Sequence, residues 1–432
     1  MRLGRSWLAL ALAGLAFLPA VASGAGYGIY EQGAAVLGMA GAGTASVNDA
    51  SAMFFNPAAM TGIPGTRLYA GGSLIQVFTS FAGMAPFPGF GVTEEMEPTR
   101  AFPGTAYLTH RFEGPWAIGL GYNSPFGLAT EWKNVDQFTG RYIVVRADLR
   151  TYNYSIGAAR ELGKKKKLSI GFGGNLVYCR ATLVNRRFIA DPGGGGGQLE
   201  VAQFGLTSNV APGYGWNGGL TWTPAKDWKV GLTYRGRVVN HADGDADITQ
   251  YSTGDPQVDA AVTASLPPDQ PASTVLILPS IASLGLAWHW GSAWTFEGDA
   301  VYTGWKAFKD IPIYFQNTTA ANTRTVENYD NSLAIRVGAE RRAAITWRAG
   351  YYHDQAAAPT ESVSPAIPDA DRHGVTAGFG MGLLADKRLT LDVYQLALFV
   401  QNRKTDGVNR DGYEGEYKSF VSSTGLSLAY HW

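Results

Sequence analysis

The chain has 432 residues, of which 16% are charged and 12% aromatic, with 55 glycines and a single cysteine. Its 35 basic and 35 acidic residues give a net charge of zero, which leaves no basic footprint for nucleic acid. The one cysteine, Cys179, excludes an intramolecular disulfide and a cysteine-based zinc motif, and we expect it to be a small apolar residue on a strand.

The first 24 residues have the pattern of a secretory leader. Arg2 and Arg5 precede an apolar stretch from Trp7 to Leu18, and small residues follow as far as Gly24. We therefore expect export, with cleavage after Gly24. The apolar stretch is short for a spanning helix, and no later stretch reaches the roughly 18 continuous apolar residues that such a helix needs.

Alternation of apolar and polar residues runs through most of the chain, which is typical of strands with one wet and one dry face. The segments that alternate are 66–80, 101–112, 115–124, 142–161, 166–186, 213–224, 227–242, 276–290, 293–308, 328–342, 344–354, 372–384, 388–402 and 416–432. About fourteen strands, an even number, predict an all-β transmembrane antiparallel barrel over residues 66–432. A mean hydropathy of −0.07 agrees, because half of each strand would face water.

The last strand alternates strictly from Phe420 and stops on an aromatic residue, Trp432. In an outer membrane such a strand has lipid on one side and the lumen on the other, with aromatic side chains at the interface. We expect this strand to close the barrel. We also expect it to engage the barrel-assembly machinery through its end at Trp432.

Short turns alternate with long polar connections between the predicted strands. The two longest connections, near 187–212 and 243–275, are rich in glycine, proline and aspartate, and we expect them to be loops on the outside. Asp243, Asp245 and Asp247 have a calcium-like spacing, but the following glycine and distal glutamate of a calcium loop are missing. We therefore predict no metal site.

Arginines indicate which face of two strands points into the lumen. In 345–352, Thr346, Arg348 and Tyr352 alternate with apolar residues, and in 230–238 the alternating positions hold Arg235 and Arg237. An arginine facing lipid near the midplane would cost about 2–4 kcal/mol, so we place these arginines inside.

Residues 25–65 do not fit a barrel wall, because they are small, apolar and without alternation. Asn48 or Asp49 is placed to cap a short helix through Phe55, and Asn56-Pro57 is a cap followed by proline at the first helical position. This segment predicts a compact helical hatch that fills the lumen, since a barrel this wide would otherwise hold an open channel.

Several short motifs, in order along the mature chain, resemble the FadL family of outer-membrane channels for long-chain fatty acids and other hydrophobic compounds. They are Ala25-Gly26-Tyr27-Gly28, Asn56-Pro57-Ala58, Gly127 to Glu131, Asn175 to Arg180, Tyr302 to Trp305, Arg348 to Tyr351 and Ile367 to Arg372. The resemblance implies a fourteen-strand barrel with an N-terminal hatch, in agreement with the strand count.

A greasy cargo needs an apolar binding groove and a moving part that releases it. We expect Met53, Phe54 and Phe55 of the hatch to offer adaptable apolar surface to the ligand. Alternation in 176–183 predicts that Tyr178 and Arg180 face inward, and the position of Arg180 resembles that of a family arginine implicated in binding the head group. The alternative for Arg180 is an internal ion pair.

The segment Asn123-Ser124-Pro125-Phe126-Gly127 interrupts the third strand. Proline has no N–H to donate, so the neighbouring strand loses a ladder bond and the wall can part there. The resemblance implies a kinked third strand through which ligand leaves sideways. The alternative is that Pro125 starts an extracellular loop.

The sequence therefore predicts a passive outer-membrane channel for hydrophobic molecules, long-chain fatty acids above others, in contact with membrane lipid and without a cofactor or an enzymatic activity. Monoaromatic hydrocarbons are the alternative cargo on the same fold. A general porin and an outer-membrane lipase remain as rivals, although no serine, histidine and acid set stands out.

Overall fold

The computed structural model describes residues 26–163, 165, 167–192, 197–384 and 388–432. The leader predicted at residues 1–24 and the predicted turn at 385–387 lie outside these residues. In the described part of the chain no helix has the length and apolar character needed to cross a membrane.

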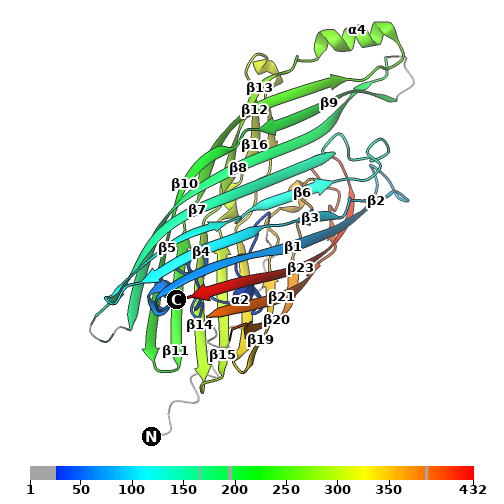
Figure 1. Cartoon of the computed structure of the whole chain (residues 1–432). Coiled ribbons are helices and arrows are strands. Elements are labelled where there is room, and N and C mark those ends of the chain that lie inside the picture. The colour runs from blue at the N-terminus through cyan, green and yellow to red at the C-terminus, as the bar shows by residue number, and fades with distance from the viewer. Residues whose placement is uncertain (1–25, 164, 166, 193–196, 385–387) are drawn as a thin grey trace.

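The strands of the wall form a closed antiparallel barrel of 14 (Figure 1). In order around the wall they are β1 (Thr66–Gly83), β4 (Gly104–Arg111), β5 (Trp116–Asn123), β7 (Arg146–Leu162), β8 (Leu168–Ala190), β10 (Ala211–Ala225), β11 (Trp228–Arg235), β14 (Ile281–Trp290), β15 (Trp294–Thr303), β18 (Ser332–Arg341), β19 (Ile345–Asp354), β20 (Arg372–Gly382), β21 (Leu389–Val400) and β23 (Gly415–His431). The first and last strands pair from Arg67 with His431 to Gly83 with Gly415, which closes the wall. The predicted barrel is confirmed, and each predicted range overlaps one wall strand.

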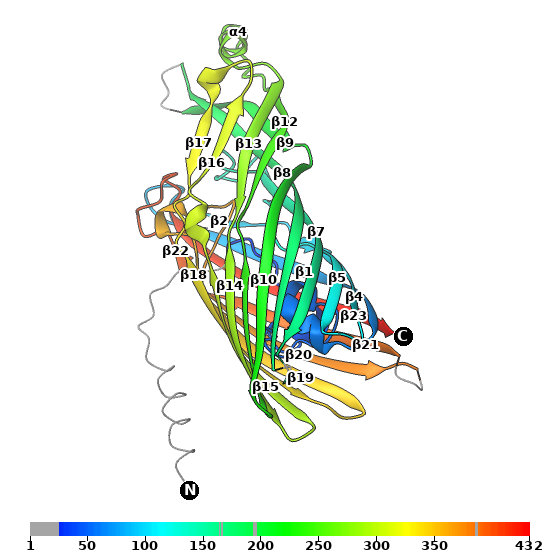
Figure 2. The same cartoon turned by 90° about the vertical axis from the view of Figure 1, so that its left-hand side faces the viewer.

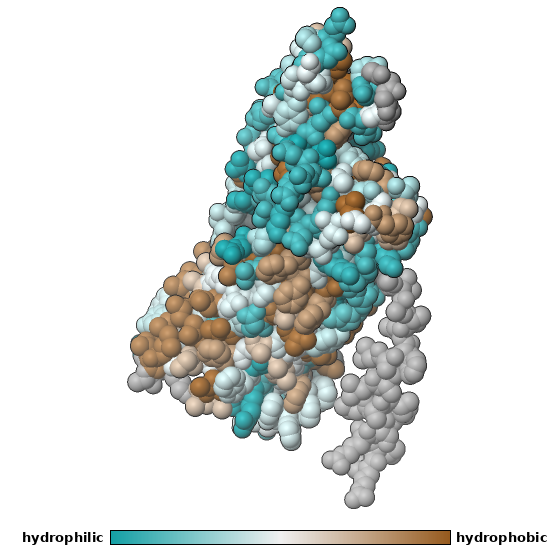
Figure 3. Space-filling view, turned by 90° about the vertical axis from the view of Figure 1, so that its right-hand side faces the viewer, coloured by the Kyte–Doolittle hydropathy of each residue, from teal (hydrophilic) through white to brown (hydrophobic). Residues whose placement is uncertain are grey.

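The two faces of the last strand differ as predicted. Leu426 and Trp432 are 54% and 58% exposed on the outside, whereas Ser423 and Ser427 are fully buried on the inside. Exposed tryptophans gather beside the short turns, at Trp116, Trp222, Trp290, Trp347 and Trp432. Together with the apolar band over the lower part of the molecule in Figure 3, they mark one membrane interface.

Above the barrel, part of the wall continues as a tall one-sided sheet (Figures 1 and 2). The upper end of β8 pairs with β9 (Gln198–Ser208), followed by β12 (Val238–Gln250), β13 (Gln270–Leu278), β16 (Asp310–Phe315) and β17 (Thr323–Val326). Helix α4 (Pro256–Ser265) packs Val262 against Val201 and Phe204 of β9. The prediction of irregular loops at 187–212 and 243–275 is therefore largely wrong.

The error has a physical reason that is visible in β12. Its buried positions hold Asn240, Ala242, Gly244 and Ala246, while the side chains between them, including Asp243 and Asp245, are exposed. The period of two is present, but small residues rather than large apolar ones occupy the covered face, because the neighbouring backbone approaches closely there.

Residues 26–65, here called the plug, lie inside the barrel (Figures 1 and 2). They form two single-turn helices, α2 (Ala34–Leu37) and α3 (Ala52–Phe55), and the 3-10 helix η1 (Pro57–Gly62). The Asn56 side chain caps η1 by accepting from Ala58 N at 3.1 Å, as predicted, and it donates to Thr44 O at 2.7 Å. For α3 the capping position is Ser51 rather than Asn48 or Asp49, and Asp49 accepts from Ser51 N at 2.8 Å.

Inward-facing glycines make room for the plug backbone. A Cβ added to Gly231 would lie 2.1 Å from Thr44 O, and one added to Gly171 would lie 2.5 Å from Ala58 N. Both distances are shorter than any tolerable contact, so these positions exclude a side chain. At these positions the backbone of the plug packs directly against the inner face of the wall strands, without intervening side chains.

Two acidic side chains of β15 hold one plug loop by its backbone. Asp299 Oδ2 accepts from Gly43 N and Thr44 N, both at 3.0 Å, and Glu297 accepts from Ala45 N at 2.6 Å and Ser46 N at 3.0 Å. The N–H groups of Gly43, Thr44 and Ala45 would otherwise be buried without a partner, which costs about 1–3 kcal/mol each. The plug is therefore fastened to the wall by polar contacts as well as by packing.

The substitution Gly231→Val should dislodge this loop, because its side chain would occupy the place of the Thr44 carbonyl. Overpacking of this kind costs about 1–3 kcal/mol. We expect more frequent open-channel events in planar-bilayer recordings of the purified protein. Gly174→Val is the matched control, since nothing lies within 4 Å of a Cβ at Gly174; equal conductance changes in both variants would contradict the fit described here.

Candidate functional site

The third strand of the wall is broken. β5 ends at Asn123 and β6 (Gly127–Glu131) resumes after Pro125, while β7 runs without interruption beside both. The predicted interruption is confirmed. The alternative, in which Pro125 starts a loop, is wrong, because β6 returns to the sheet and pairs Gly127 with Arg150.

The break leaves a gap between the second and third strands. Their ladder ends at Ala106 and Tyr122, and backbone hydrogen bonding resumes where Glu97 N donates to Glu131 O at 2.8 Å. Between these points the second strand consists of β3 (Thr99–Ala101), Phe102 and Pro103, which pair with β1 alone among the described residues. Among the described residues no backbone hydrogen bond joins the two strands across this opening, and the Thr99 hydroxyl, which donates to Ala129 O at 3.1 Å, provides a side-chain contact at its upper end.

The plug provides hydrogen-bond partners for the strand edge that the break exposes. Ile29 N donates to Pro125 O at 2.9 Å, and Gly127 N donates to Tyr27 O at 3.0 Å. The side chain of Gln32 adds a bond from Nε2 to Ser124 O at 2.7 Å and accepts from Asn123 Nδ2 at 3.1 Å. The beginning of the plug therefore takes the place of the missing neighbouring strand.

A cavity of about 530 Å³ lies above this contact and reaches the gap. Its size is within the range of small-molecule sites, about 300–1,000 Å³. Apolar side chains from the inner faces of β1, β6, β7, β21 and β23 line much of it: Ile75, Val77, Leu128, Leu149, Leu398 and Val421. At the gap the lining continues to side chains that face outward, Arg100, Phe102 and Arg150.

Arg372 lines the inner end of the cavity together with Glu31, Asp354 and Asp369, whereas Arg336 lies behind Tyr30 and Tyr352 and lines a separate, smaller space. Arg372 donates to Gly26 O at 2.8 Å and to Asp369 at 3.0 Å. Arg336 of β18 is 1% exposed and lies between the rings of Tyr30, at 4.1 Å, and Tyr352, at 4.7 Å. Its Nη1 donates to Ala40 O at 2.9 Å, but Nε and Nη2 are buried without a hydrogen-bond partner. A buried cation with unpaired donors favours an anionic ligand.

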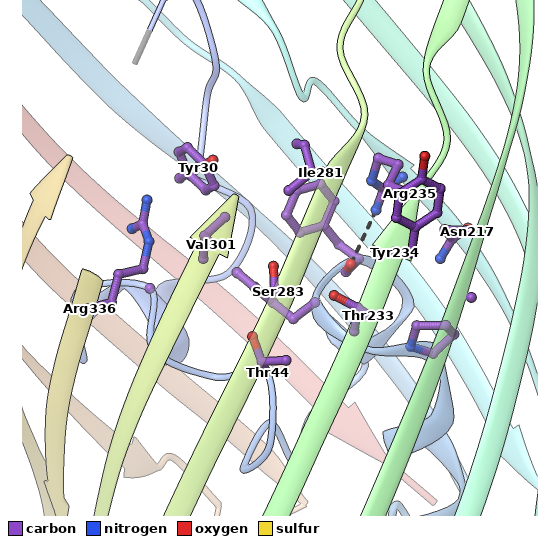
Figure 4. Close-up of a pocket in the computed structure, with 15 residues that line it drawn as sticks. Tyr30, Thr44, Asn217, Thr233, Tyr234, Arg235, Ile281, Ser283, Val301 and Arg336 are labelled. Carbon is purple, nitrogen blue, oxygen red and sulfur yellow. Dashed lines mark hydrogen bonds between the residues drawn. The ribbon is translucent and has the colours of Figure 1, made fainter. Parts of the chain in front are cut away.

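A smaller space of about 50 Å³ lies between the plug and β11, β14 and β15 (Figure 4). Arg235 and Arg336 stand on opposite sides of it. Arg235 donates to Phe54 O at 3.1 Å and lies over the Phe54 ring at 4.7 Å, which confirms that this arginine faces inward. Arg348 is also inside as predicted, between Glu340 at 2.7 Å and Asp392 at 2.6 Å. The prediction for Arg237 is wrong, because β11 ends at Arg235 and Arg237 is exposed beyond it.

Sequence alternation gave the wrong orientation for the upper part of β8. Val177 and Cys179 are buried inside in one apolar cluster with Tyr27 and Phe126, whereas Tyr178 and Arg180 face outward. Arg180 lines a shallow hollow on the outer face together with Asp245 and Asp247. The ligand role predicted for Tyr178 and Arg180 rested on an inward orientation and gains no support from this placement.

The predicted apolar plug residues separate into two places. Met53 packs against the wall, since a Cβ at Gly119 would lie 2.4 Å from its sulfur, and Phe54 and Phe55 line the smaller space. None of the three lines the large cavity. Arg336 was missed, although Ile335 and Val337 on either side of it carry the same alternation that placed Arg348.

A cluster of aromatic side chains roofs the plug beside the cavity. Trp305 lies 4.8 Å from Tyr27 between ring centroids, and Phe308 lies 5.4 Å from Tyr27 and 5.0 Å from Tyr329. Next to Tyr329, Glu327 is 3% exposed and pairs with Arg410 at 3.0 Å. Burial raises the pKa of Glu327 to about 7, against the opposing effect of Arg410.

A closed barrel with an apolar outer band, an internal plug and a ligand-sized cavity that ends at a gap in its wall defines a transport barrel of the outer membrane. The comparisons identify the family. Residues 15–432 match the model of the outer membrane protein transport protein family (OMPP1/FadL/TodX), so the chain belongs to this family and is a transport protein rather than an enzyme.

Known relatives match the chain over nearly its full length. It is 25% identical over 450 residues to the long-chain fatty acid transport protein of Salmonella typhi, covering 98% of each chain. It is 26% identical over 431 residues to the 47 kDa outer membrane protein of Pasteurella multocida strain Pm70, covering 96% of each. These relatives agree with an outer-membrane location.

Solved structures show the same fold. A Pseudomonas aeruginosa FadL homologue superimposes with a TM-score of 0.82 at 21% identity, over 94% of this chain and all of that one. The Pseudomonas putida toluene transporter TodX gives a TM-score of 0.73 at 18% identity, over 94% of this chain and 99% of that one.

The roof beside Glu327 should loosen as the pH rises. In the closed roof the carboxyl keeps its proton up to about pH 7, whereas in an opened roof it ionises near its ordinary pKa of 4.5. Opening therefore releases a proton between these values, so its free energy falls by up to about 3 kcal/mol from pH 4.5 to 7. Hydrogen exchange of the amides at 326–331, corrected for intrinsic rates, measures this, and Glu327→Gln should abolish the dependence. An unchanged pH profile in that variant would refute it.

Proposed function

We propose that the protein is a passive channel for hydrophobic carboxylates, long-chain fatty acids above others, which bind in the 530 Å³ cavity and leave sideways through the gap in the third strand. The single observation that carries this proposal is the continuity of the cavity. Its lining runs from Arg372 and the carboxylates of Asp354 and Asp369 beside the plug, past apolar side chains, to outward-facing side chains in the wall.

The energetics suit capture followed by release. Burial of roughly 200 Å² of an acyl tail is worth about 5 kcal/mol at 25 cal/mol per Å². This is enough to draw a tail from dilute solution, and the membrane beyond the gap offers the tail an equally apolar environment. Transfer then follows the concentration gradient without an energy source.

Movement of the plug controls this route in our proposal. The four hydrogen bonds that join Tyr27, Ile29 and Gln32 to residues 123–127 fix the kinked segment. If a ligand displaces Tyr27 and Gly28, the kink loses the bonds on its free edge and the cavity gains a continuous path to the gap. Because each such bond contributes only about 0.5–1.5 kcal/mol, ligand binding can offset their loss.

Carboxylate cargo is favoured over neutral cargo by Arg372, which lines the cavity, and by Arg336 behind Tyr30, whose two unpaired donors a head group that displaces Tyr30 could reach. Relatives that match along 98% of the chain are long-chain fatty acid transport proteins, which agrees with this cargo. The alternative, monoaromatic hydrocarbons, is supported by the toluene transporters that share the fold.

The C-terminal strand supports one further partner. Tyr430 and Trp432 face outward at the end of β23, where an aromatic end of a barrel strand is exposed for recognition. We propose that the barrel-assembly machinery binds the chain there, and a chain truncated before Tyr430 should accumulate outside the outer membrane in cell fractionation.

The substitution Arg336→Met should weaken binding of oleate about 10- to 100-fold, since charge-assisted hydrogen bonds are worth about 1.5–3 kcal/mol. Binding of methyl oleate, which lacks the charge, should change little. Fluorescence titration of refolded protein measures both, with Arg341→Met at the turn as the matched control. Equal losses for acid and ester would show only a damaged plug, and unchanged oleate binding together with tight toluene binding would favour the hydrocarbon alternative.

A disulfide between Gly28→Cys and Phe126→Cys should stop uptake until it is reduced. These two residues form an antiparallel bridge, and such pairs have Cα separations that a disulfide can span. Radiolabelled oleate uptake by cells, with and without reductant, measures the effect. A cross-link between Ala70→Cys and Leu428→Cys, which pair within the fixed wall, is the control. Full uptake through the oxidised plug cross-link would rule out release of the kink.

A further inference from the structure

The outer lip of the gap carries arginines on both sides. Arg100 lies on β3 opposite Gln76 of β1, and Arg150 lies on β7 opposite Gly127. Both point away from the lumen. On β1 the buried side chain is Ile75, next to Gln76, and on β7 Leu149 and Thr151 are buried while the Arg150 side chain is 61% exposed. Both nevertheless line the cavity, because the cavity continues through the gap.

The charge at this lip is incompletely compensated. Arg150 pairs with Asp148 at 2.9 and 3.1 Å, but Arg180, its direct neighbour across the β7–β8 ladder, and Arg100 have no hydrogen-bond or ion-pair partner among the described residues. The other acidic side chains nearby are Glu97, which follows Met96 above the gap, and Glu131, which stands opposite Arg146. Asp245 and Asp247 share the outer hollow with Arg180, without an ion pair to it. The lip therefore keeps unpaired guanidinium groups next to an apolar opening.

The strands beside the gap place the arginines at a membrane interface. Along the outer face of β7 the order is Ile156, 65% exposed, then Tyr154, 50% exposed, then Tyr152 and Arg150. The Tyr154 ring lies 5.3 Å from that of Tyr122, directly below the gap. This order, with an apolar residue first, then tyrosine and then arginine, follows the change from membrane hydrocarbon to head groups.

We propose that Arg100 and Arg150 form a head-group site at the outer lip, which takes the carboxylate of a single-chain amphiphile as its tail passes from the cavity into the membrane. The inference rests on the proposed function and adds a second binding site to the proposed route. Phe102, 73% exposed and two residues after Arg100 in the same lining, gives the tail an apolar surface.

Physical chemistry favours such a station. A carboxylate that followed its tail into hydrocarbon would lose hydration at a cost of several kcal/mol, whereas a carboxylate held at the interface by guanidinium groups stays hydrated and paired. The site therefore distinguishes acids from neutral compounds during exit, a step at which cavity affinity has no influence. Neutral hydrocarbons would cross the same gap without using it.

The test is transport by the full-length protein in proteoliposomes, with Arg100→Gln and Arg150→Gln combined. We expect oleate efflux from the cavity to slow about fivefold, in keeping with exposed ion pairs, while oleate affinity stays within twofold and oleyl alcohol transport is unchanged. The lysine double variant should restore the rate, and Arg160→Gln, an outward arginine at the opposite end of β7, should have no effect.

The outcomes separate this site from the rest of the mechanism. Equal slowing of acid and alcohol would show a structural role of the lip and overturn the proposal, as would an unchanged oleate rate. Loss of a co-purified phosphate-bearing lipid in native mass spectrometry, with oleate transport intact, would show that the arginines hold membrane lipid instead. If the unmodified protein neither binds nor transports oleate, the proposed function itself fails, whatever the variants do.

Discussion

An open strand edge in a membrane wall must find hydrogen-bond partners within the protein, and this constraint governs the whole molecule. Pro125 removes one donor and turns the third strand out of its ladder. The exposed edge is then satisfied by Tyr27 and Ile29 of the plug. The kinked segment and the first residues of the plug therefore form one hydrogen-bonded unit.

The remainder of the plug is held differently. Carboxylates of β15 accept hydrogen bonds from its backbone, and glycines such as Gly231 and Gly171 leave space for that backbone. On the opposite side Arg336 donates to Ala40 O and lies over the Tyr30 ring. These contacts are buried and directional, whereas the bonds at the kink are few. Mobility is therefore expected at the first residues of the plug, and the body of the plug serves as the fixed support against which they move.

The barrel was predictable because period-two alternation survives wherever lipid lies on one side and water or protein on the other, as in the strand around Arg348. The same alternation gave the wrong side-chain orientation where the lumen itself is apolar. Cys179 looked lipid-facing, yet it meets Tyr27 and Phe126 inside. The sheet above the membrane was missed because β12 alternates alanine with aspartate. Local alternation also places Arg336 inside, but its contact with Tyr30 and the two-sided lip at Arg100 depend on how distant segments meet, which no local pattern reveals.

The position of the plug in the chain has a consequence for biogenesis. It directly precedes β1, and β1 pairs with β23, the last strand to be made, along the full closing seam. The plug must therefore already lie within the forming sheet when β1 and β23 pair. After closure, the close contact between plug backbone and wall glycines leaves no space for the plug to enter. The order of folding steps, rather than later docking of the plug, therefore decides whether the lumen of such a barrel is filled.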